Sequence, residues 1–502
     1  MKREARSMLM AATSTKQIIL LVDTLERLGL GYHFDSEIEE KLKQVYDSVE
    51  EEQDAHNLFV AALRFRLLRQ HQYHVSCNVF EKFVGENKEF KETLGGDAEG
   101  ILSLYEAAHV RTGEENILEG AVEFTRRQLS RMLPELKSPH LREKVKRALK
   151  HPLHRSVPIV EIRFYIPIYE NDESRDELLL KLAKLNFNYL QNMYRNELVQ
   201  LLRWWNKFDI KSKLVYTRDR MVECYFWGMI HNFEPKYSYV RKAAAINYQL
   251  ITIIDDIYDN YATLEEAEQF TRALERWNMD HADNLPDYMK VVYDFNMNVY
   301  EDIEREAKKQ DKTFILPYYR EAVKDICRAY YEEQKWVMQR EMPSFEKYMK
   351  NSVIRSCLPM TLGSLVPGLQ SVTKETIDWM LTQPKIFMSS SIIVRLLDDL
   401  GSHERENKEG KLLTIVDCYM KDKGGSKQEA LSKFGEIIDS EWKDMNEEWV
   451  KSAALPKEIL LQFLNFIRGG EVTYSNSEDG HTNPEKYLAP IITALLLDPL
   501  LI

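Results

Sequence analysis

Apolar residues recur at three- and four-residue steps along most of this chain. Ile18, Val22 and Leu25 follow that spacing, and the apolar residues of Leu58–Leu68 repeat it. Such spacing places apolar side chains on one face of a helix. Strong alternating strand patterns are missing from the sequence, as are Asn-Gly or Asp-Gly turns between apolar runs. The pattern therefore predicts an all-α protein.

One segment interrupts the helical pattern and suggests a domain boundary. His151–Asp176 contains three prolines, and its apolar stretches are too short for a typical helix. A long amphipathic pattern then runs from 178 to 205. Because prolines and polar turns mark linkers, we predict a linker or domain edge near residues 170–178. The expected domains are an N-terminal helical domain, 1–175, and a C-terminal helical domain, 176–502.

Composition and charge narrow the class of protein. The chain has 502 residues with only 19 glycines and 16 prolines, and 44% of its residues are hydrophobic. This composition predicts a folded protein with a sizeable core. A net charge of −12 disfavours a nucleic-acid partner. Five cysteines lie outside any CxxC spacing, which is typical of reduced thiols in a non-oxidising compartment.

Targeting and membrane signals are weak in the sequence. The most apolar candidate span, Leu488–Ile502, is interrupted by Pro490, Asp498 and Pro499 and is too short to cross a bilayer. The first residues, Met-Lys-Arg-Glu-Ala-Arg, contain no apolar signal core. We therefore expect a cytoplasmic protein without a membrane span.

The first cluster with candidate chemistry is acidic. Asp255, Asp256 and Asp259 directly follow the apolar run Leu250–Ile254. On an α-helix, Asp255 and Asp259 share one face. Oxygen-only ligands select a hard cation, Mg²⁺ or Mn²⁺, that also binds substrate phosphates. The alternative for this motif alone is a solvated acidic helix end.

A second row of oxygen donors follows another apolar segment. Asp398, Ser402 and Glu406 stand at positions i, i+4 and i+8, so they fall on one side of a helix. Two carboxylates and a hydroxyl suit a further Mg²⁺. Taken alone, the row could be a charged surface turn. Two such rows in one helical chain favour a metal-dependent site.

Three arginines could bind the anion that such metals bridge. Arg218 and Arg220 lie upstream of the first aspartates, and Arg395 stands one helical turn before Asp398. Guanidinium groups match phosphate oxygens in paired hydrogen bonds. A pair of surface salt bridges is the alternative for Arg218 and Arg220.

Several further residues suggest a pocket beside the acidic rows. Each aromatic is, taken singly, more often a core residue, but aromatic faces can stabilise a cation. The segment Ser475–Pro484 is rich in polar residues, and we predict an exposed loop there. The candidates for substrate binding are Trp227, Tyr248, Thr252, Tyr474 and Asp479.

These motifs together resemble the plant class I terpene synthases, most closely the sesquiterpene synthases of angiosperms. The likeness covers nearly the whole chain. IIDDIYDNYATLEE (253–266) and LLDDLGSHERE (396–406) resemble the two metal motifs of the family, and YTRDRMVECYFW (216–227) resembles its RxR segment. Segments 63–83 and 105–121 are similar to the N-terminal helical domain of the family.

The resemblance implies a fold, a reaction and a set of ligands. It implies an α-helical class I catalytic domain beside a vestigial helical domain, in a monomer. Both acidic rows would bind three Mg²⁺ ions, with Mn²⁺ as the alternative, while Arg218, Arg220 and Arg395 hold the diphosphate. The implied reaction ionises and cyclises a prenyl diphosphate, with farnesyl diphosphate as the expected substrate, to a sesquiterpene, and the Ser475–Pro484 loop would close over it. Geranyl diphosphate is the next substrate candidate.

Departures from the family pattern leave other readings open. The DxDD motif of protonation-initiated cyclisation is missing. The chain also begins inside the family pattern, so we expect either a truncated chain or a variant that lacks the arginine-rich N-terminal segment of the family. His481 stands where relatives often have tyrosine. A chain-elongating prenyltransferase would carry two DDxxD motifs, whereas Ser402 and Glu406 occupy the second row here. An inactive helical scaffold is the remaining alternative.

Overall fold

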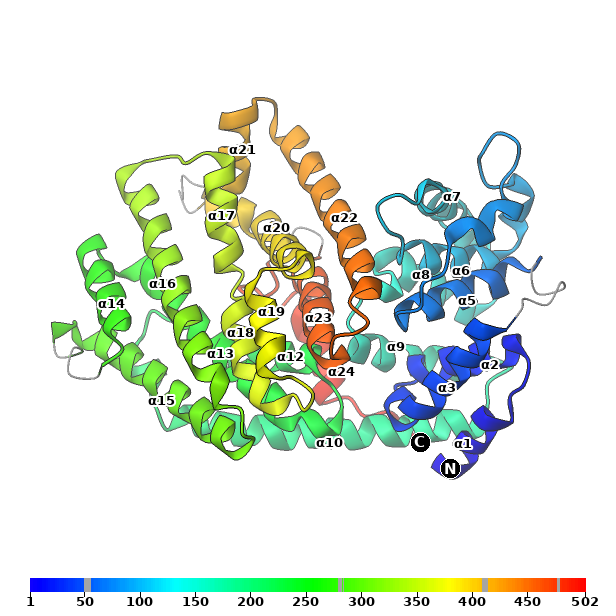
Figure 1. Ribbon diagram of the computed structural model, residues 1–502, viewed down its shortest axis with the longest axis horizontal. Helices are drawn as coiled ribbons and strands as arrows, with labels where there is room; N and C mark the ends of the chain where they lie inside the picture. Colours follow the sequence, from blue (N-terminus) through cyan, green and yellow to red (C-terminus); the bar gives the residue numbers. More distant parts are fainter. Residues whose placement is uncertain (49–55, 279–281, 283, 409–413, 476–478) are drawn as a thin grey trace. The chain divides into compact units, whose positions relative to one another are not determined.

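The computed structural model describes residues 1–48, 56–278, 282, 284–408, 414–475 and 479–502, and of 404–408 only the helical backbone. This described part consists of helices and loops, with one isolated β-bridge between Val84 and Phe90, so the prediction of an all-α protein is confirmed (Figure 1). It divides into two compact units. Unit 1 comprises 1–192, 442–454 and 493–502, and unit 2 comprises 193–441 and 455–492.

Unit 1 is built from short amphipathic helices around an apolar core. The predicted series beginning at Ile18 lies on α2, where the Ser14 side chain caps the helix by accepting from the Gln17 amide at 3.3 Å. Phe65 of α5 packs with Phe80 in the core. The helices are α1 (Lys2–Ala11), α2 (Thr15–Arg27), α3 (Asp35–Asp47), α5 (Leu58–Gln70), α6 (Ala98–Ala108), α7 (Asn116–Met132), α8 (Pro139–Lys150) and α9 (Pro158–Glu170).

Helix α9 corrects the sequence-based expectation for 151–176. Pro158 stands in the first turn of this helix, where a missing N–H costs nothing. Pro167 lies inside the helix but near its end, so few hydrogen bonds are affected. Ile159, Ile162 and Ile166 are buried, and their packing outweighs the cost of the proline. The residues before α9 form only a short 3-10 turn, Leu153–Arg155, and the turn after Glu170 is also irregular. Helix α10 (Glu177–Asn206) then confirms the predicted long helix.

Unit 2 contains the larger helices. A buried ion pair anchors two of them, because Arg241 of α13 contacts the Glu197 carboxylate of α10 through two nitrogens at 2.8 and 2.9 Å. The helices after α10 are α11 (Ile210–Lys213), α12 (Met221–His231), α13 (Ser238–Asp256), α14 (Leu264–Arg276), α15 (Asp287–Lys309), α16 (Leu316–Gln339), α17 (Phe345–Arg355), α18 (Leu358–Leu365), α19 (Lys374–Leu381), α20 (Lys385–Lys408), α21 (Ile415–Lys423), α22 (Lys427–Lys451), α23 (Lys457–Thr473) and α24 (Leu488–Leu496).

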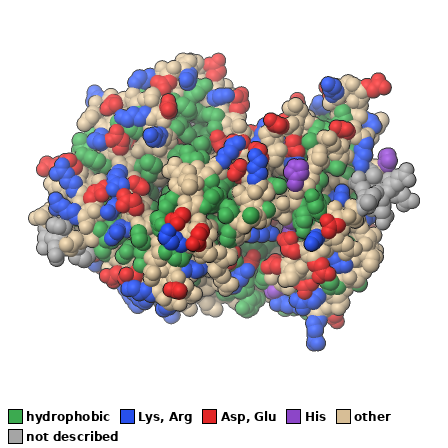
Figure 2. Space-filling model, in the orientation of Figure 1, with side chains coloured by type: hydrophobic (Ala, Val, Ile, Leu, Met, Phe, Trp, Pro, Cys, Tyr) green, Lys and Arg blue, Asp and Glu red, His purple; other side chains and the backbone are tan. Residues whose placement is uncertain are grey.

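The surface carries charges of both signs. On the face drawn in Figure 2, Lys and Arg side chains are intermixed with Asp and Glu. Many of these charges pair along single helices, such as Arg272 with Glu268 at 2.6 Å on α14. Exposed pairs of this kind contribute little to stability. Within the described ranges, no helix combines the length and apolar character needed to cross a membrane.

Candidate active site

A cavity of about 680 Å³ lies within unit 2, within the usual size range of small-molecule sites. Helices α12, α13, α16, α17, α20 and α23 contribute its walls, together with the segment 479–482. The structure brings most of the sequence-predicted residues to this one cavity. Those lining it are Arg218, Trp227, Tyr248, Thr252, Asp255, Asp256, Asp259, Arg395, Asp398, Ser402, Tyr474 and Asp479.

The first acidic row is not a continuous α-helix, as the sequence suggested. Helix α13 ends at Asp256, and Ile257–Tyr261 forms a π-helical turn that contains Asp259. Turns of this type often occur at functional sites. Asp255 and Asp259 still face the same cavity, with side chains 24% and 19% exposed. They therefore remain accessible as oxygen ligands.

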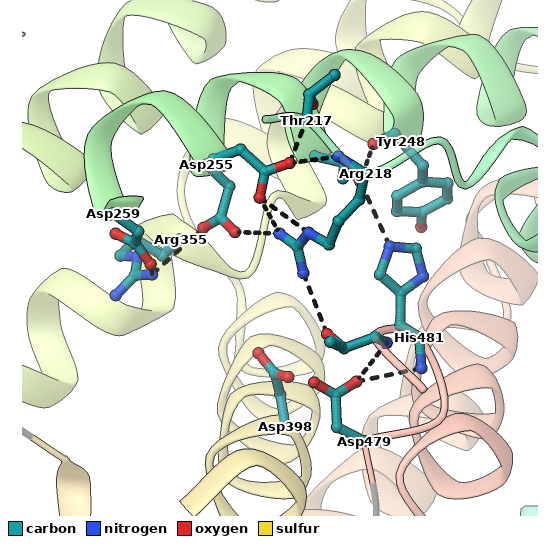
Figure 3. A network of polar contacts seen from close by, with 12 residues as sticks. Thr217, Arg218, Tyr248, Asp255, Asp259, Arg355, Asp398, Asp479 and His481 are labelled. Carbon is teal, nitrogen blue, oxygen red and sulfur yellow. Dashed lines mark hydrogen bonds and ion pairs between the residues drawn. The ribbon is translucent and has the colours of Figure 1, made fainter. Parts of the chain in front are cut away.

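Asp256 has different surroundings from its two neighbours. Its side chain is 3% exposed, and one carboxylate oxygen accepts hydrogen bonds from Thr217 Oγ1 at 3.0 Å and the Arg218 amide at 2.9 Å. The other oxygen accepts from Arg218 Nε at 2.8 Å. Figure 3 labels Arg218, which this contact holds beside Asp255. Both oxygens of Asp256 are thus occupied by protein donors.

Arg218 is held between two carboxylates. Its Nη2 donates to Asp255 Oδ2 at 2.8 Å, in addition to the contacts with Asp256. Burial lowers the pKa of the Arg218 guanidinium, but the nearby charges of Asp255 and Asp256 raise it by a larger amount. The net pKa therefore lies above its usual value. The side chain is a fixed cation on the cavity wall.

The second acidic row lies on α20. Arg395 donates from Nη1 to Asp398 Oδ2 at 2.6 Å and forms a second ion pair with Asp399. Burial also raises the pKa of nearby Tyr474 well above its usual value, with Asp398 adding to the shift. Ser402 reaches the cavity wall one turn later. The predicted ligand Glu406 lies on the same helix, but its side chain is outside the described residues.

Residues 479–482 fold inward, which corrects the expectation of an exposed loop for this part of Ser475–Pro484; residues 476–478 lie outside the described residues. Asp479 is buried, and its Oδ1 accepts from the amides of His481 at 3.1 Å and Thr482 at 2.9 Å. Thr482 Oγ1 accepts from Arg218 Nη1 at 3.1 Å, and the Thr482 carbonyl accepts from Arg220 Nη2 at 2.7 Å. These hydrogen bonds satisfy backbone and side-chain polar groups that would bind water in an exposed loop.

Arg220 is the predicted arginine that does not reach the cavity wall. Its contacts are with backbone oxygens, those of Thr482 and Asp219. Arg355 of α17, by contrast, lines the cavity and was missed by the sequence analysis. Its Nη2 lies 3.6 Å from Asp255 Oδ1 and 3.7 Å from Asp259 Oδ2. No motif surrounds Arg355 in the sequence, so only the packing reveals it.

A buried carboxylate balances Arg355. Glu333 of α16 forms an ion pair with its Nη1, and both side chains are largely buried. Burial lowers the pKa of Arg355, while Asp259 and other anions raise it, and the net pKa lies above the usual value. The polar end of the cavity thus combines three arginine cations with an excess of carboxylates.

Aromatic and aliphatic side chains form the other end of the cavity. The rings of Trp227 and Tyr248 are 5.2 Å apart, and that of Phe466 is 5.9 Å from Trp227. Gly469 makes room for this arrangement, since a Cβ there would lie 2.5 Å from the Trp227 ring. Thr252 Oγ1 lies 3.4 Å from His481 Nε2. The cavity is therefore polar and charged at one end and aromatic at the other.

The donor set fits a hard divalent cation. Across the described side chains, no three His, Cys, Asp or Glu residues form a cluster that could hold a metal ion. Mg²⁺, however, usually takes one or two protein carboxylates and completes its shell with water and phosphate oxygens. Asp255 and Asp259 on one wall and Asp398 with Ser402 on the other match this requirement.

Fold and site together define a metal-dependent, all-helical enzyme class that handles a ligand with one anionic and one apolar end. Two family models match the chain: the terpene synthase N-terminal domain over residues 1–149, and the terpene synthase metal-binding domain over residues 206–444. The chain belongs to the terpene synthase family.

Curated relatives and solved structures match the full chain. Gamma-cadinene synthase of Ocimum basilicum is 52% identical, and tau-cadinol synthase of Lavandula angustifolia 51% identical, over 100% of this chain and 92% and 91% of theirs. The crystal structure of isoprene synthase from grey poplar (Populus x canescens), in complex with three Mg²⁺ ions and dimethylallyl-S-thiolodiphosphate, is 35% identical with a TM-score of 0.94. It covers 100% of this chain and 96% of that one.

Proposed function

We propose that this protein ionises farnesyl diphosphate and cyclises the resulting cation to a sesquiterpene, with release of diphosphate. One observation supports this most strongly. Two rows of oxygen donors and the cations Arg218, Arg395 and Arg355 surround one end of a cavity whose other end is aromatic. A diphosphate with a long apolar tail has matching chemistry at its two ends.

We assign substrate binding at the polar end to the arginines. Arg218, fixed by Asp255 and Asp256, presents donors for the phosphate oxygens. Arg395 does so from the α20 wall. Preorganised cations stabilise a departing anion without reorganisation at the moment of reaction. We assign to Asp256 the role of holding Arg218, since both its oxygens are already engaged.

We assign divalent metal binding to Asp255, Asp259, Asp398, Ser402 and Glu406, and we infer Mg²⁺ as the ion, with three ions by analogy to the poplar complex. Bound metal ions would polarise the phosphate oxygens and neutralise the charge that develops on the leaving diphosphate.

The aromatic end supports the assignment of the hydrocarbon chain. Trp227, Tyr248 and Phe466 present ring faces that attract a cation, by about 2 kcal/mol or more when water is excluded. The inward-folded segment 479–484 contacts both Arg218 and Arg220 through Thr482, and this contact helps to exclude water that would quench the cation.

The length of the substrate is inferred from the relatives. Cadinene and cadinol synthases, which match the whole chain at about half identity, carry sesquiterpene product names. We accordingly favour the C15 diphosphate over geranyl diphosphate. All cavity-lining residues fall between 216 and 482, so we place catalysis in the 176–502 domain and none in 1–175.

A product assay tests the proposal. The purified chain is incubated with Mg²⁺ and C10, C15 or C20 prenyl diphosphate, diphosphate release is measured, and volatile products are identified by gas chromatography with mass spectrometry. We expect cyclic C15 products that require the metal. Turnover of geranyl diphosphate alone would reassign the substrate, chain elongation on addition of isopentenyl diphosphate would indicate a prenyltransferase, and no turnover would refute the proposal.

A further inference from the structure

A buried hydrogen-bonded chain runs from the aromatic end of the cavity into the core of unit 2. Tyr248 Oη of α13 lies 2.9 Å from Nε2 of His231, the last residue of α12. His231 Nδ1 lies 3.1 Å from Gln462 Oε1 of α23. The Tyr248 and His231 rings are stacked, with an interplanar angle of 18°. His231 is fully buried, while Tyr248 lines the cavity.

The direction of every hydrogen bond in this chain follows from its far end. Gln462 Nε2 lies 2.9 Å from the Glu458 carbonyl oxygen, which can only accept, and 3.0 Å from Asn232 Oδ1. The Gln462 amide is therefore oriented with its oxygen toward His231, so Nδ1 of His231 carries the proton and donates. In a neutral imidazole, Nε2 is then the acceptor. The Tyr248 hydroxyl must donate its proton to His231.

The surroundings keep His231 neutral. Burial lowers the pKa of His231 to about 4, although the hydrogen bond to Gln462 acts in the opposite direction. The hydrogen-bonding side chains that face the imidazole, Tyr248 and Gln462, carry no charge. Burial also raises the pKa of Tyr248 well above its usual value, so the hydroxyl keeps its proton at neutral pH. The resting pair is a phenol beside a free imidazole nitrogen.

We propose that Tyr248 and His231 form the proton acceptor that ends the cyclisation, an inference that rests on the proposed function. A C–H bond next to the cationic carbon breaks, and its electron pair becomes the C=C bond of the product. The proton passes to Tyr248 Oη as the hydroxyl proton moves to His231 Nε2, which leaves neutral tyrosine and an imidazolium. After product release, the imidazolium returns its proton through Tyr248 to water.

The geometry favours this role over a purely structural one. A C–H bond beside a carbocation is so acidic that even a weakly basic imidazole suffices as the acceptor, provided that it is positioned. Tyr248 is the member of the chain that reaches the cavity wall, and its ring lies 5.2 Å from that of Trp227. The acceptor is thus placed at the aromatic end, away from the charged end where ionisation takes place.

Two substitutions separate proton transfer from packing. Tyr248→Phe keeps the ring and its stacking but removes the hydroxyl. His231→Gln keeps both hydrogen bonds, because an amide N–H can donate to Gln462 and an amide oxygen can accept from Tyr248, yet it removes the basic nitrogen. Tyr225→Phe is the matched control: Tyr225 is a buried tyrosine of α12 whose hydroxyl donates to Glu197.

The experiment compares ionisation with product composition in the full chain. With farnesyl diphosphate and Mg²⁺, the products of each variant are quantified relative to the diphosphate that the same variant releases. The main wild-type alkene should fall by about tenfold relative to alcohols and other isomers, a change of roughly 1.4 kcal/mol in partitioning. The double variant should match either single variant, because both remove one relay. Tyr225→Phe should keep the wild-type products.

The outcomes are distinct for the two proposals. Wild-type product composition in Tyr248→Phe or in His231→Gln overturns the relay, as does an additive double variant. If Tyr248→Phe does not fold, His231→Gln alone decides. Absence of diphosphate release by the wild type overturns the proposed function itself. Diphosphate release by the wild type, together with unchanged products in the variants, overturns only the relay.

Discussion

Replacing Asp256 by asparagine tests how the site divides its carboxylates between metal and arginine. The substitution keeps the shape but replaces a negative oxygen with an amide. Asp256 accepts from Thr217 Oγ1, the Arg218 amide and Arg218 Nε at 2.8–3.0 Å. An asparagine NH₂ group on either side of the carboxylate would face one of these donors. We therefore expect Arg218 to lose its fixed position while Asp255 and Asp259 stay accessible.

The size of the effect follows from the contacts that are lost. A hydrogen bond to a charged group contributes about 1.5–3 kcal/mol net, and Arg218 retains its contact with Asp255 at 2.8 Å. If about 2–4 kcal/mol of transition-state stabilisation is lost, kcat falls by roughly 30- to 1000-fold, because about 1.4 kcal/mol corresponds to each factor of ten. The Mg²⁺ concentration for half-maximal activity should change by less than about threefold, because both oxygens of Asp256 are engaged by protein donors.

The assay is a Mg²⁺ titration of diphosphate release in Asp256→Asn, with Asp255→Asn for comparison. Asp255→Asn should raise the Mg²⁺ requirement by tenfold or more, since that side chain is 24% exposed toward the cavity. Asp287→Asn removes the same charge from a fully exposed position at the start of α15 and should behave as wild type. A near-normal kcat with a strongly raised Mg²⁺ requirement in Asp256→Asn would refute the reasoning.

Three further tests concern the packing and the charges behind the site. Gly469→Ala should shift Trp227, because a Cβ would lie 2.5 Å from its ring; we expect altered products by gas chromatography, whereas Gly435→Ala, with open space around it, should keep them. Arg241→Met leaves its buried carboxylate partner unpaired and should cost about 3–5 kcal/mol in urea unfolding; an unchanged midpoint would contradict this. Because the folded pKa of His231 is about 4, below its unfolded value, its contribution to stability is complete above about pH 6.5 and is lost as the pH falls toward 4. The melting temperature of His231→Gln should therefore fall less than that of wild type over this range, and parallel curves would argue against it.

Local patterns in the sequence were sufficient for the fold class and for much of the site. The apolar spacing predicted α2, α5 and α10 because side chains three and four positions apart share a helix face. The same geometry placed Asp398 and Ser402 on one wall of the cavity, and Asp255 and Asp259 reach it even though a π turn replaces the expected α-helix.

The sequence-based predictions were wrong where packing overrides local conformational preference. Pro158 and Pro167 suggested an irregular segment, yet buried isoleucines stabilise α9 around them. The polar composition of Ser475–Pro484 suggested an exposed loop. In the structure, Asp479 satisfies two amides of that segment and is buried.

Taken by itself, the amino-acid order determined which residues share a helix face, because that depends on spacing within a few turns. Contacts across long separations depended on how the helices pack. Arg218 meets Thr482 264 positions away, and His231 meets Gln462 231 positions away. Arg355, the last residue of α17, likewise approaches Asp255 and Asp259 because α17 packs against α16 and α20. Such meetings carry no local signal, since they follow from the packing of whole helices around the cavity.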